Sequence, residues 1–235
     1  MMAGRGRTAA PSEGRIERRG FLRAAAGSAG GLLLASCLPE PAPSPSGPSP
    51  SGPPAATPVP RPALARGLSR EAVRTLAAAT ARTRMAEYQQ CAQATFATLQ
   101  ELFGLEGDAL IRALAPLPGI AERGETCGAV TAALLAFGLI FGERAPGGAA
   151  AWRQTLPPAR AFCDRFVVLL GSTRCRELLR RRLGQELDLA TAAGQEQYRG
   201  LAGPAACREI VQQAVGIAVE VILDQAPAWG ERGRG

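Results

Sequence analysis

An uncharged, apolar stretch of sixteen residues constrains the fold of this chain most strongly. It runs from Cys127 to Gly142 and reads CGAVTAALLAFGLIFG. A helix of this composition is apolar on every side, so neighbouring elements have to bury it. The stretch is shorter than the ~20 residues that cross a bilayer, and Gly142 is a natural helix end. We therefore expect a small all-α helical bundle around a buried central helix at about 127–142.

Helical spacing of apolar residues dominates the chain around this stretch. The pattern predicts helices over residues 69–103, 108–114, 157–170, 175–179 and 204–225. The first of these is either one long helix or two helices with a break between residues 83 and 90. Segments 149–156 and 184–203 carry no clear pattern. No run alternates with the period of a strand, which favours the all-α class.

The N-terminus has the features of a targeting segment. The run from Arg18 and Arg19 to Arg23, Arg-Arg-Gly-Phe-Leu-Arg, resembles the twin-arginine export signal of bacteria. Leu34-Ala-Ser-Cys37 then resembles a lipobox, which makes Cys37 the lipidated first residue of the mature protein. The alternative is an ordinary signal peptide with a chance cysteine. We expect an exported lipoprotein, anchored to the membrane at the outer face of the bacterial cytoplasmic membrane.

Composition divides the chain into four parts. Residues 1–36 are the signal peptide, and residues 37–66 are a tether rich in Pro, Ser and Gly that cannot bury a core. Residues 67–227 form the cysteine-containing helical domain. Residues 228–235 are expected to be a disordered tail.

Charge and the absence of histidine exclude several functions. The net charge is +7, but residues 1–36 hold six Arg against two Glu, and few aromatic residues accompany the basic ones, so we expect no nucleic-acid partner. Without His there is no His-liganded metal, no His-ligated haem and no His-based catalytic pair or triad. No conventional catalytic constellation remains, so cysteine is the side chain left as a candidate for redox chemistry or metal binding.

The placement of the cysteines suggests a shared site. Cys127, Cys175 and Cys207 each fall in the first turn of an expected helix, where the dipole favours a thiolate, and Thr126 is positioned to cap the helix at Cys127. Cys91 faces the same interior. Cys163 lies on an apolar stripe with Phe166, Val167 and Leu170, which explains it as packing. We expect Cys91, Cys127, Cys175 and Cys207 to converge on one site. Glu125 is a candidate hydrogen-bond partner for a thiol there, or for a sulfur of a bound metal cluster.

The segments around these cysteines also resemble a known family. They read Tyr88-Gln-Gln-Cys91, Gly124-Glu-Thr-Cys127-Gly-Ala-Val-Thr-Ala-Ala-Leu, Cys175-Arg-Glu-Leu-Leu and Cys207-Arg-Glu-Ile-Val. In this order they are similar to the blocks of the C_GCAxxG_C_C family, over about residues 70–225. The resemblance maps the four family cysteines onto Cys91, Cys127, Cys175 and Cys207. The Gly that usually closes the central motif is Ala132 here.

The resemblance implies redox activity and leaves three interpretations open. A related helical domain occurs in split-Soret cytochromes, where cysteines hold an iron-sulfur centre beside c-type haems; this chain has no haem motif, so only the cluster carries over. The four thiols then bind an iron-sulfur cluster, or zinc, and exchange electrons with a redox partner protein. Alternatively they exchange thiols and disulfides with a partner, or they staple a helical binding module. An oxidising compartment favours disulfides, whereas export of an already folded protein favours a cofactor.

Overall fold

The computed structural model describes residues 63–143 and 148–225, which belong to one compact unit. The twin-arginine motif, Cys37, nearly all of the expected tether and the expected tail lie outside the described residues. Residues 144–147 lie outside them as well. No helix in the described part is both long enough and apolar enough to cross a membrane.

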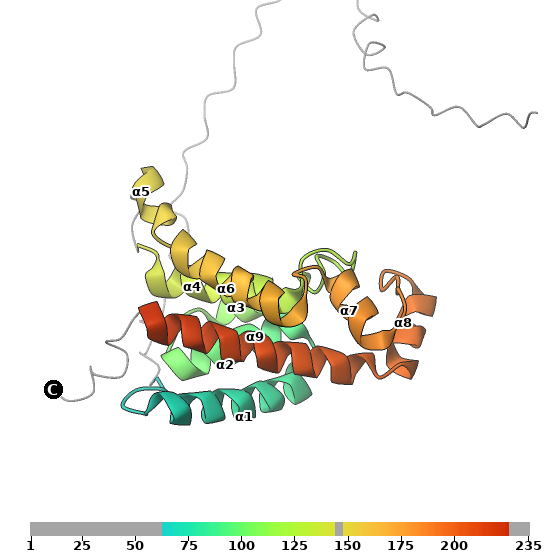
Figure 1. The fold of residues 1–235 in the computed structure, drawn as a ribbon, viewed down its shortest axis with the longest axis horizontal. Coiled ribbons are helices and arrows are strands. Elements are labelled where there is room, and N and C mark those ends of the chain that lie inside the picture. Colours follow the sequence, from blue (N-terminus) through green and yellow to red (C-terminus); the bar gives the residue numbers. More distant parts are fainter. Residues whose placement is uncertain (1–62, 144–147, 226–235) are drawn as a thin grey trace, which may run out of the picture. The chain divides into compact units, whose positions relative to one another are not determined.

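The described residues form nine α-helices and no strand, which confirms the all-α class. The helices are α1 (Arg70–Tyr88), α2 (Cys91–Phe103), α3 (Asp108–Ala113), α4 (Gly128–Phe141), α5 (Gly148–Arg153), α6 (Leu156–Leu170), α7 (Cys175–Leu183), α8 (Ala192–Gly200) and α9 (Gly203–Gln225). Figure 1 shows that α2, α4 and α9 begin at the same end of the bundle, where α7 and α8 also lie. This common end brings together residues that are far apart in the sequence.

The two residues between the first helices decide that residues 69–103 form two helices. Gln89 has a left-handed backbone with φ of 53°, which ends α1. Gln90 then caps α2, because its side-chain oxygen accepts a hydrogen bond from the Gln93 N–H at 2.7 Å. The Gln90 amide also donates to the carbonyls of Leu114 and Ala115, at 3.1 and 3.0 Å. One side chain therefore fixes both the start of α2 and the segment after α3.

The centre of the bundle is shared by α2 and α9 rather than held by α4. Helix α2 packs on α1, α3, α4 and α9, and α9 packs on α1, α2, α4, α6, α7 and α8. Helix α4 buries the face that includes Ala129, Ala133 and Phe137, but Leu139 is 44% exposed. The expectation that this helix is buried on all sides was therefore wrong, because neighbouring helices cover it mainly on one face.

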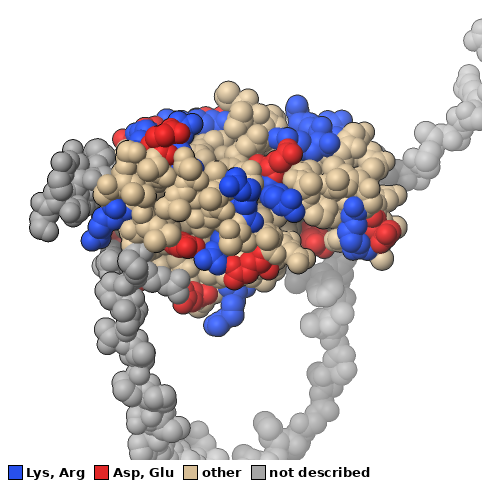
Figure 2. Space-filling model, turned by 90° about the horizontal axis from the view of Figure 1, so that it is seen from below, with Lys and Arg blue, Asp and Glu red and all other residues tan. Residues whose placement is uncertain are grey.

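Ion pairs join helices on the surface of the bundle. Arg70 on α1 and Arg165 on α6 both contact Asp224 on α9, each at 2.9 Å, and Arg70 also pairs with Glu220. Basic and acidic side chains are intermingled on the face that Figure 2 shows. Exposed pairs of this kind are screened by water and contribute little, so apolar packing remains the main source of stability.

Candidate functional site

Four cysteines lie at the end of the bundle where α2, α4, α7 and α9 begin. Cys91 and Cys175 are the first residues of α2 and α7, and Cys127 is the N-cap of α4. Helix α9 begins at Gly203, so Cys207 lies one turn inside it rather than in its first turn as predicted. Cys91 takes the third helix-start position instead. The structure thus brings the four predicted site residues to one end of the fold.

Backbone hydrogen bonds join the loops that carry Cys127 and Cys175. Thr126 and Arg174 form an isolated antiparallel bridge. The Cys127 N–H donates to the Thr173 carbonyl at 2.8 Å, and the Cys175 N–H donates to the Glu125 carbonyl at 2.6 Å. Pairing of the two loops therefore holds the two cysteines at diagonal positions of one short bridge, although they are far apart in the sequence.

One side-chain prediction in these loops was wrong, and the other remains a prediction. Thr126 does not cap α4, because the helix starts one residue later than expected and Cys127 itself occupies the N-cap position. The Glu125 carboxylate lies 3.5 Å from the Arg174 guanidinium, which is the ion-pair contact found for it in the described structure. The cap predicted for Thr126 is therefore absent, whereas a hydrogen bond from Glu125 to a cluster sulfur remains a prediction.

A left-handed turn precedes the Cys127 loop and packs on the site. Gly119, Ile120, Ala121 and Glu122 have φ of 52°, 51°, 55° and 61°, a conformation that costs each non-glycine residue roughly 1–2 kcal/mol. The turn is held by two hydrogen bonds of 2.7 Å, from the Ala121 N–H to the Pro116 carbonyl and from the Glu122 N–H to the Pro118 carbonyl. A Cβ atom on Gly119 would lie 3.2 Å from the Cys175 Sγ. The glycine therefore lets the backbone lie directly against this thiol.

The Cys91 sulfur lies where the N-termini of α2 and α4 meet. It accepts hydrogen bonds from the backbone N–H groups of Ala92 and Gly128, and its thiol is in hydrogen-bond contact with Cys127. A Cβ atom on Gly128 would lie 2.7 Å from the Cys91 Sγ, so only glycine allows this approach. The sequence predicted that backbone N–H groups at the start of α4 would stabilise the Cys127 sulfur. The Gly128 N–H there hydrogen-bonds to the Cys91 sulfur instead.

Cys91, Cys175 and Cys207 are neutral thiols at pH 7 in the metal-free protein, although thiolates were expected at Cys175 and Cys207. The Cys127 contact and burial raise the pKa of Cys91 well above its ordinary value. Burial, with neighbouring thiols, raises the pKa of Cys175 and of Cys207 to about 12. Loss of hydration outweighs the helix dipoles at these positions. The mutual influence of Cys91, Cys175 and Cys207 also shows that they share one electrostatic environment.

Tyr198 is a site residue that sequence reasoning missed. It lies on α8, in the polar segment without a clear helical pattern, and its hydroxyl hydrogen-bonds to the Cys207 sulfur. Burial raises the pKa of the phenol, as do Cys207, Cys91 and Cys175. A lone tyrosine in a polar segment gives no sequence signal for such a role.

The donor atoms at this end of the bundle are the four thiols and a buried threonine hydroxyl. No three His, Cys, Asp or Glu side chains in the described part stand close enough together to hold one metal ion. A cluster with cysteine ligands spreads its four thiolates over several metal atoms, so it does not need them around one point. The Thr95 hydroxyl, one turn after Cys91, is fully buried and has no hydrogen-bond partner among the described residues. It is a spare donor on the same face of α2 as Cys91.

Cys163 lies apart from this site on α6. It is half-buried, and its predicted stripe was partly wrong, because Val167 is 43% exposed. The buried face of α6 consists of Pro158, Phe162, Phe166 and Leu170, four residues apart. Cys163 packs at the edge of that face, which keeps its interpretation as a packing residue.

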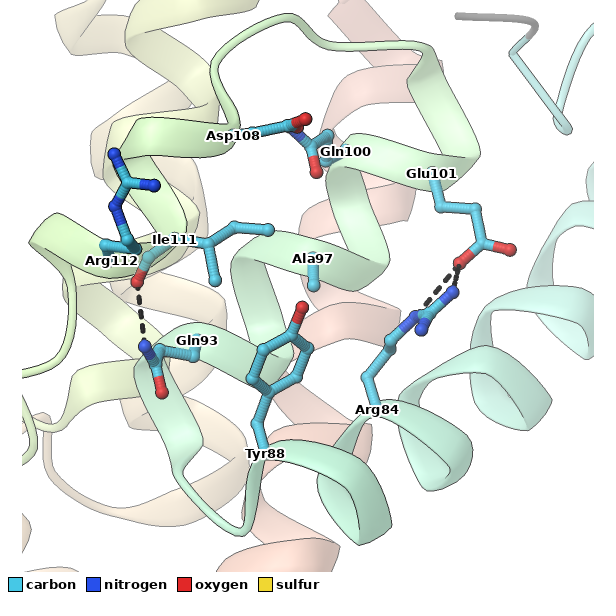
Figure 3. Close-up of a pocket in the computed structure, with 9 residues that line it drawn as sticks. All are labelled: Arg84, Tyr88, Gln93, Ala97, Gln100, Glu101, Asp108, Ile111 and Arg112. Carbon is cyan, nitrogen blue, oxygen red and sulfur yellow. Dashed lines mark hydrogen bonds and ion pairs between the residues drawn. The ribbon is translucent and has the colours of Figure 1, made fainter.

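A polar pocket of about 490 Å³ lies on the opposite face of α2 from Cys91. Figure 3 shows Tyr88 pointing into it beside Ala97, with the pair of Arg84 and Glu101 along one wall. The Arg84 guanidinium donates to the Glu101 carboxylate at 2.6 Å. Helical geometry therefore separates this pocket from the four thiols.

Comparison with known proteins identifies the family. No curated protein and no solved structure matches the chain significantly. The family model described as "Putative redox-active protein (C_GCAxxG_C_C)" matches residues 89–221, more than half of the chain and the whole of the segment that carries the four thiols. The chain therefore belongs to the C_GCAxxG_C_C family.

Proposed function

We propose that the chain is an electron-transfer protein in which Cys91, Cys127, Cys175 and Cys207 bind an iron-sulfur cluster. The observation that carries this proposal is the convergence of four thiols, from four helices, in one largely buried place. Packing alone does not require four cysteines to gather at one end of the bundle. Family membership adds a redox role, and four cysteine thiolates are the usual ligand set of such clusters.

The residues around the thiols have separate roles in this proposal. The N–H groups of Ala92 and Gly128 hydrogen-bond to the Cys91 sulfur, and the Tyr198 hydroxyl does so at Cys207. Hydrogen bonds to ligand sulfurs and burial are two of the factors that set a cluster's reduction potential. The bound cluster supplies one-electron transfer with a partner protein. Because thiols of the free site are protonated, loading releases protons and becomes weaker as the pH falls.

The experiment measures iron, zinc and acid-labile sulfide in the full chain purified without oxygen, together with its visible spectrum. We expect iron and sulfide in comparable amounts and broad absorption near roughly 400 nm from charge transfer between sulfur and iron. Stoichiometric zinc without sulfide would replace the cluster by a zinc site. A colourless, metal-free protein after reconstitution with iron and sulfide would refute the proposal.

One contact favours a second candidate, thiol-disulfide chemistry. Cys91 and Cys127 are already in hydrogen-bond contact, so a bond between their sulfurs needs little movement. Forming it releases two electrons and two protons, which a partner disulfide takes up to become a dithiol. Burial of both thiols, 8% and 4% exposed, opposes direct attack by a bulky partner. Loss of free thiols in pairs on oxidation, without bound iron, would select this candidate.

A further inference from the structure

Helix α8 reaches the thiol site through Tyr198, and few buried residues hold the helix in place. It packs on α9, and Gly194 is its one buried residue. The Gln195 amide donates to the Glu122 carboxylate at 2.8 Å, which ties α8 to the left-handed turn beside Cys175. Segments with few buried apolar contacts open at low free-energy cost. Helix α8 is therefore the part of the site most easily moved.

Tyr198 connects α8 to the thiols. Its hydroxyl contacts the Cys207 sulfur, and its ring packs on Gly203 at the start of α9. A Cβ atom on Gly203 would lie 2.1 Å from the tyrosine Cδ2, so the ring fills the space that any other residue would occupy. Gly203 is buried, and a larger residue there would have to displace the ring.

We propose that α8 is a lid on the thiol site, and that Tyr198, seated on Gly203, is the positioning residue that closes it over Cys207. The inference rests on the proposed function only in taking the four thiols as the working site. Cys207 is only partly buried in the closed state, and a small reagent, a metal ion or a redox partner gains fuller access to it when α8 and its tyrosine move away. The ring supplies the cover, and the hydroxyl orients the sulfur.

The test follows labelling of each cysteine by N-ethylmaleimide, a small neutral reagent, in the metal-free, reduced full chain. Peptide mass spectrometry gives separate rates, with Cys163 as the internal reference outside the site. We expect Tyr198→Ala to accelerate labelling of Cys207 by about tenfold or more, because the cover is lost. Tyr198→Phe keeps the ring and should stay within about twofold of the natural chain.

Two glycine variants on α9 provide a matched pair. Gly203→Ala should displace the ring and accelerate Cys207, whereas Gly216→Ala, which has open space around it, should not. In a Tyr198→Ala background, Gly203→Ala should add nothing, because the group it strikes is gone. Unchanged Cys207 labelling in Tyr198→Ala, or equal acceleration of Cys163, would overturn the lid.

Iron and sulfide content of the natural chain separates this inference from the proposed function. Accelerated Cys207 labelling in Tyr198→Ala, with no iron bound by the natural chain after reconstitution, would keep the lid and refute the cluster. A cluster bound by the natural chain, with Cys207 labelling unchanged in Tyr198→Ala, would keep the proposed function and refute the lid.

Discussion

Protonation is the main chemical property of the individual thiols. Cys175 and Cys207 ionise only near pH 12 in the folded, metal-free protein, because burial disfavours their charged forms. Neutral thiols are poor nucleophiles and poor ligands. A partner or metal that uses them therefore has to displace protons from a buried site.

This protonation predicts that the metal-free, reduced chain loses stability in alkali. Between the ordinary thiol pKa near 9 and the folded value of about 12, the unfolded chain binds fewer protons than the folded one. The free energy of unfolding then falls as pH rises, by about 1.4 kcal/mol per pH unit for each thiol. Urea titrations between about pH 8 and pH 10.5 measure it. A double variant, Cys175→Ala with Cys207→Ala, should show a shallower dependence, and an equal slope would contradict the burial argument.

Sequence reasoning at this scale identified which cysteines lie at one end of the bundle but not their surroundings. Helix starts near Cys127 and Cys175 were readable from Thr, Ser and Gly signals, so their convergence was predictable. The Gly128 N–H hydrogen-bonds to the Cys91 sulfur because α4 begins at Gly128, one residue beyond the expected start. Tyr198 was not predictable, because its contact with Cys207 depends on how α8 folds back onto α9.

Two helices approach each other closely at the site, and one glycine permits it. A Cβ atom on Gly128 would lie 2.7 Å from the Cys91 Sγ and 3.1 Å from the Ala92 backbone N. Gly128→Ala should therefore destabilise the chain by about 1–3 kcal/mol and reduce cluster content, because α2 and α4 are forced apart. Chemical denaturation and iron analysis measure both effects.

Gly138 in the same helix is the control for this prediction. It is exposed, with nothing within 4 Å of its Cβ direction, so Gly138→Ala should stabilise the chain by up to about 1 kcal/mol through helix propensity. Destabilisation of equal size in both variants would show that the helix, rather than the close approach, is responsible.

Most helices were predictable from local signals, and the misses have physical causes. Ser69, Gly104 and Gly171 end or begin helices as expected, because capping is local. Helix α8 was missed because its residues are polar and its stability depends on tertiary contacts. The one-sided burial of α4 could not be read from its composition, because burial depends on how many neighbours surround the helix.

At the scale of the whole molecule, the proposal joins a redox domain to a membrane anchor. Replacing Cys37→Ala should release the protein from the membrane or leave it unprocessed, because the thioether to lipid cannot form. Fractionation of cells that express the natural chain and the variant measures this. Cys163→Ala is the control cysteine change, because Cys163 lies on α6 far from the N-terminal signal in the sequence, and it should leave fractionation unchanged. Full membrane retention of a processed Cys37→Ala protein would remove the lipoprotein proposal.

The central claim, that Cys91, Cys127, Cys175 and Cys207 form one redox centre from which Cys163 is excluded, is tested most directly by comparing two variants. Iron content and a reductive titration of the visible spectrum are measured for Cys127→Ser and Cys163→Ala beside the natural chain. We predict that Cys127→Ser loses the redox signal, because a hydroxyl does not replace a thiolate. Cys163→Ala should keep the signal at a stability cost on the order of 1 kcal/mol. Loss of the signal in Cys163→Ala with retention in Cys127→Ser would contradict the account.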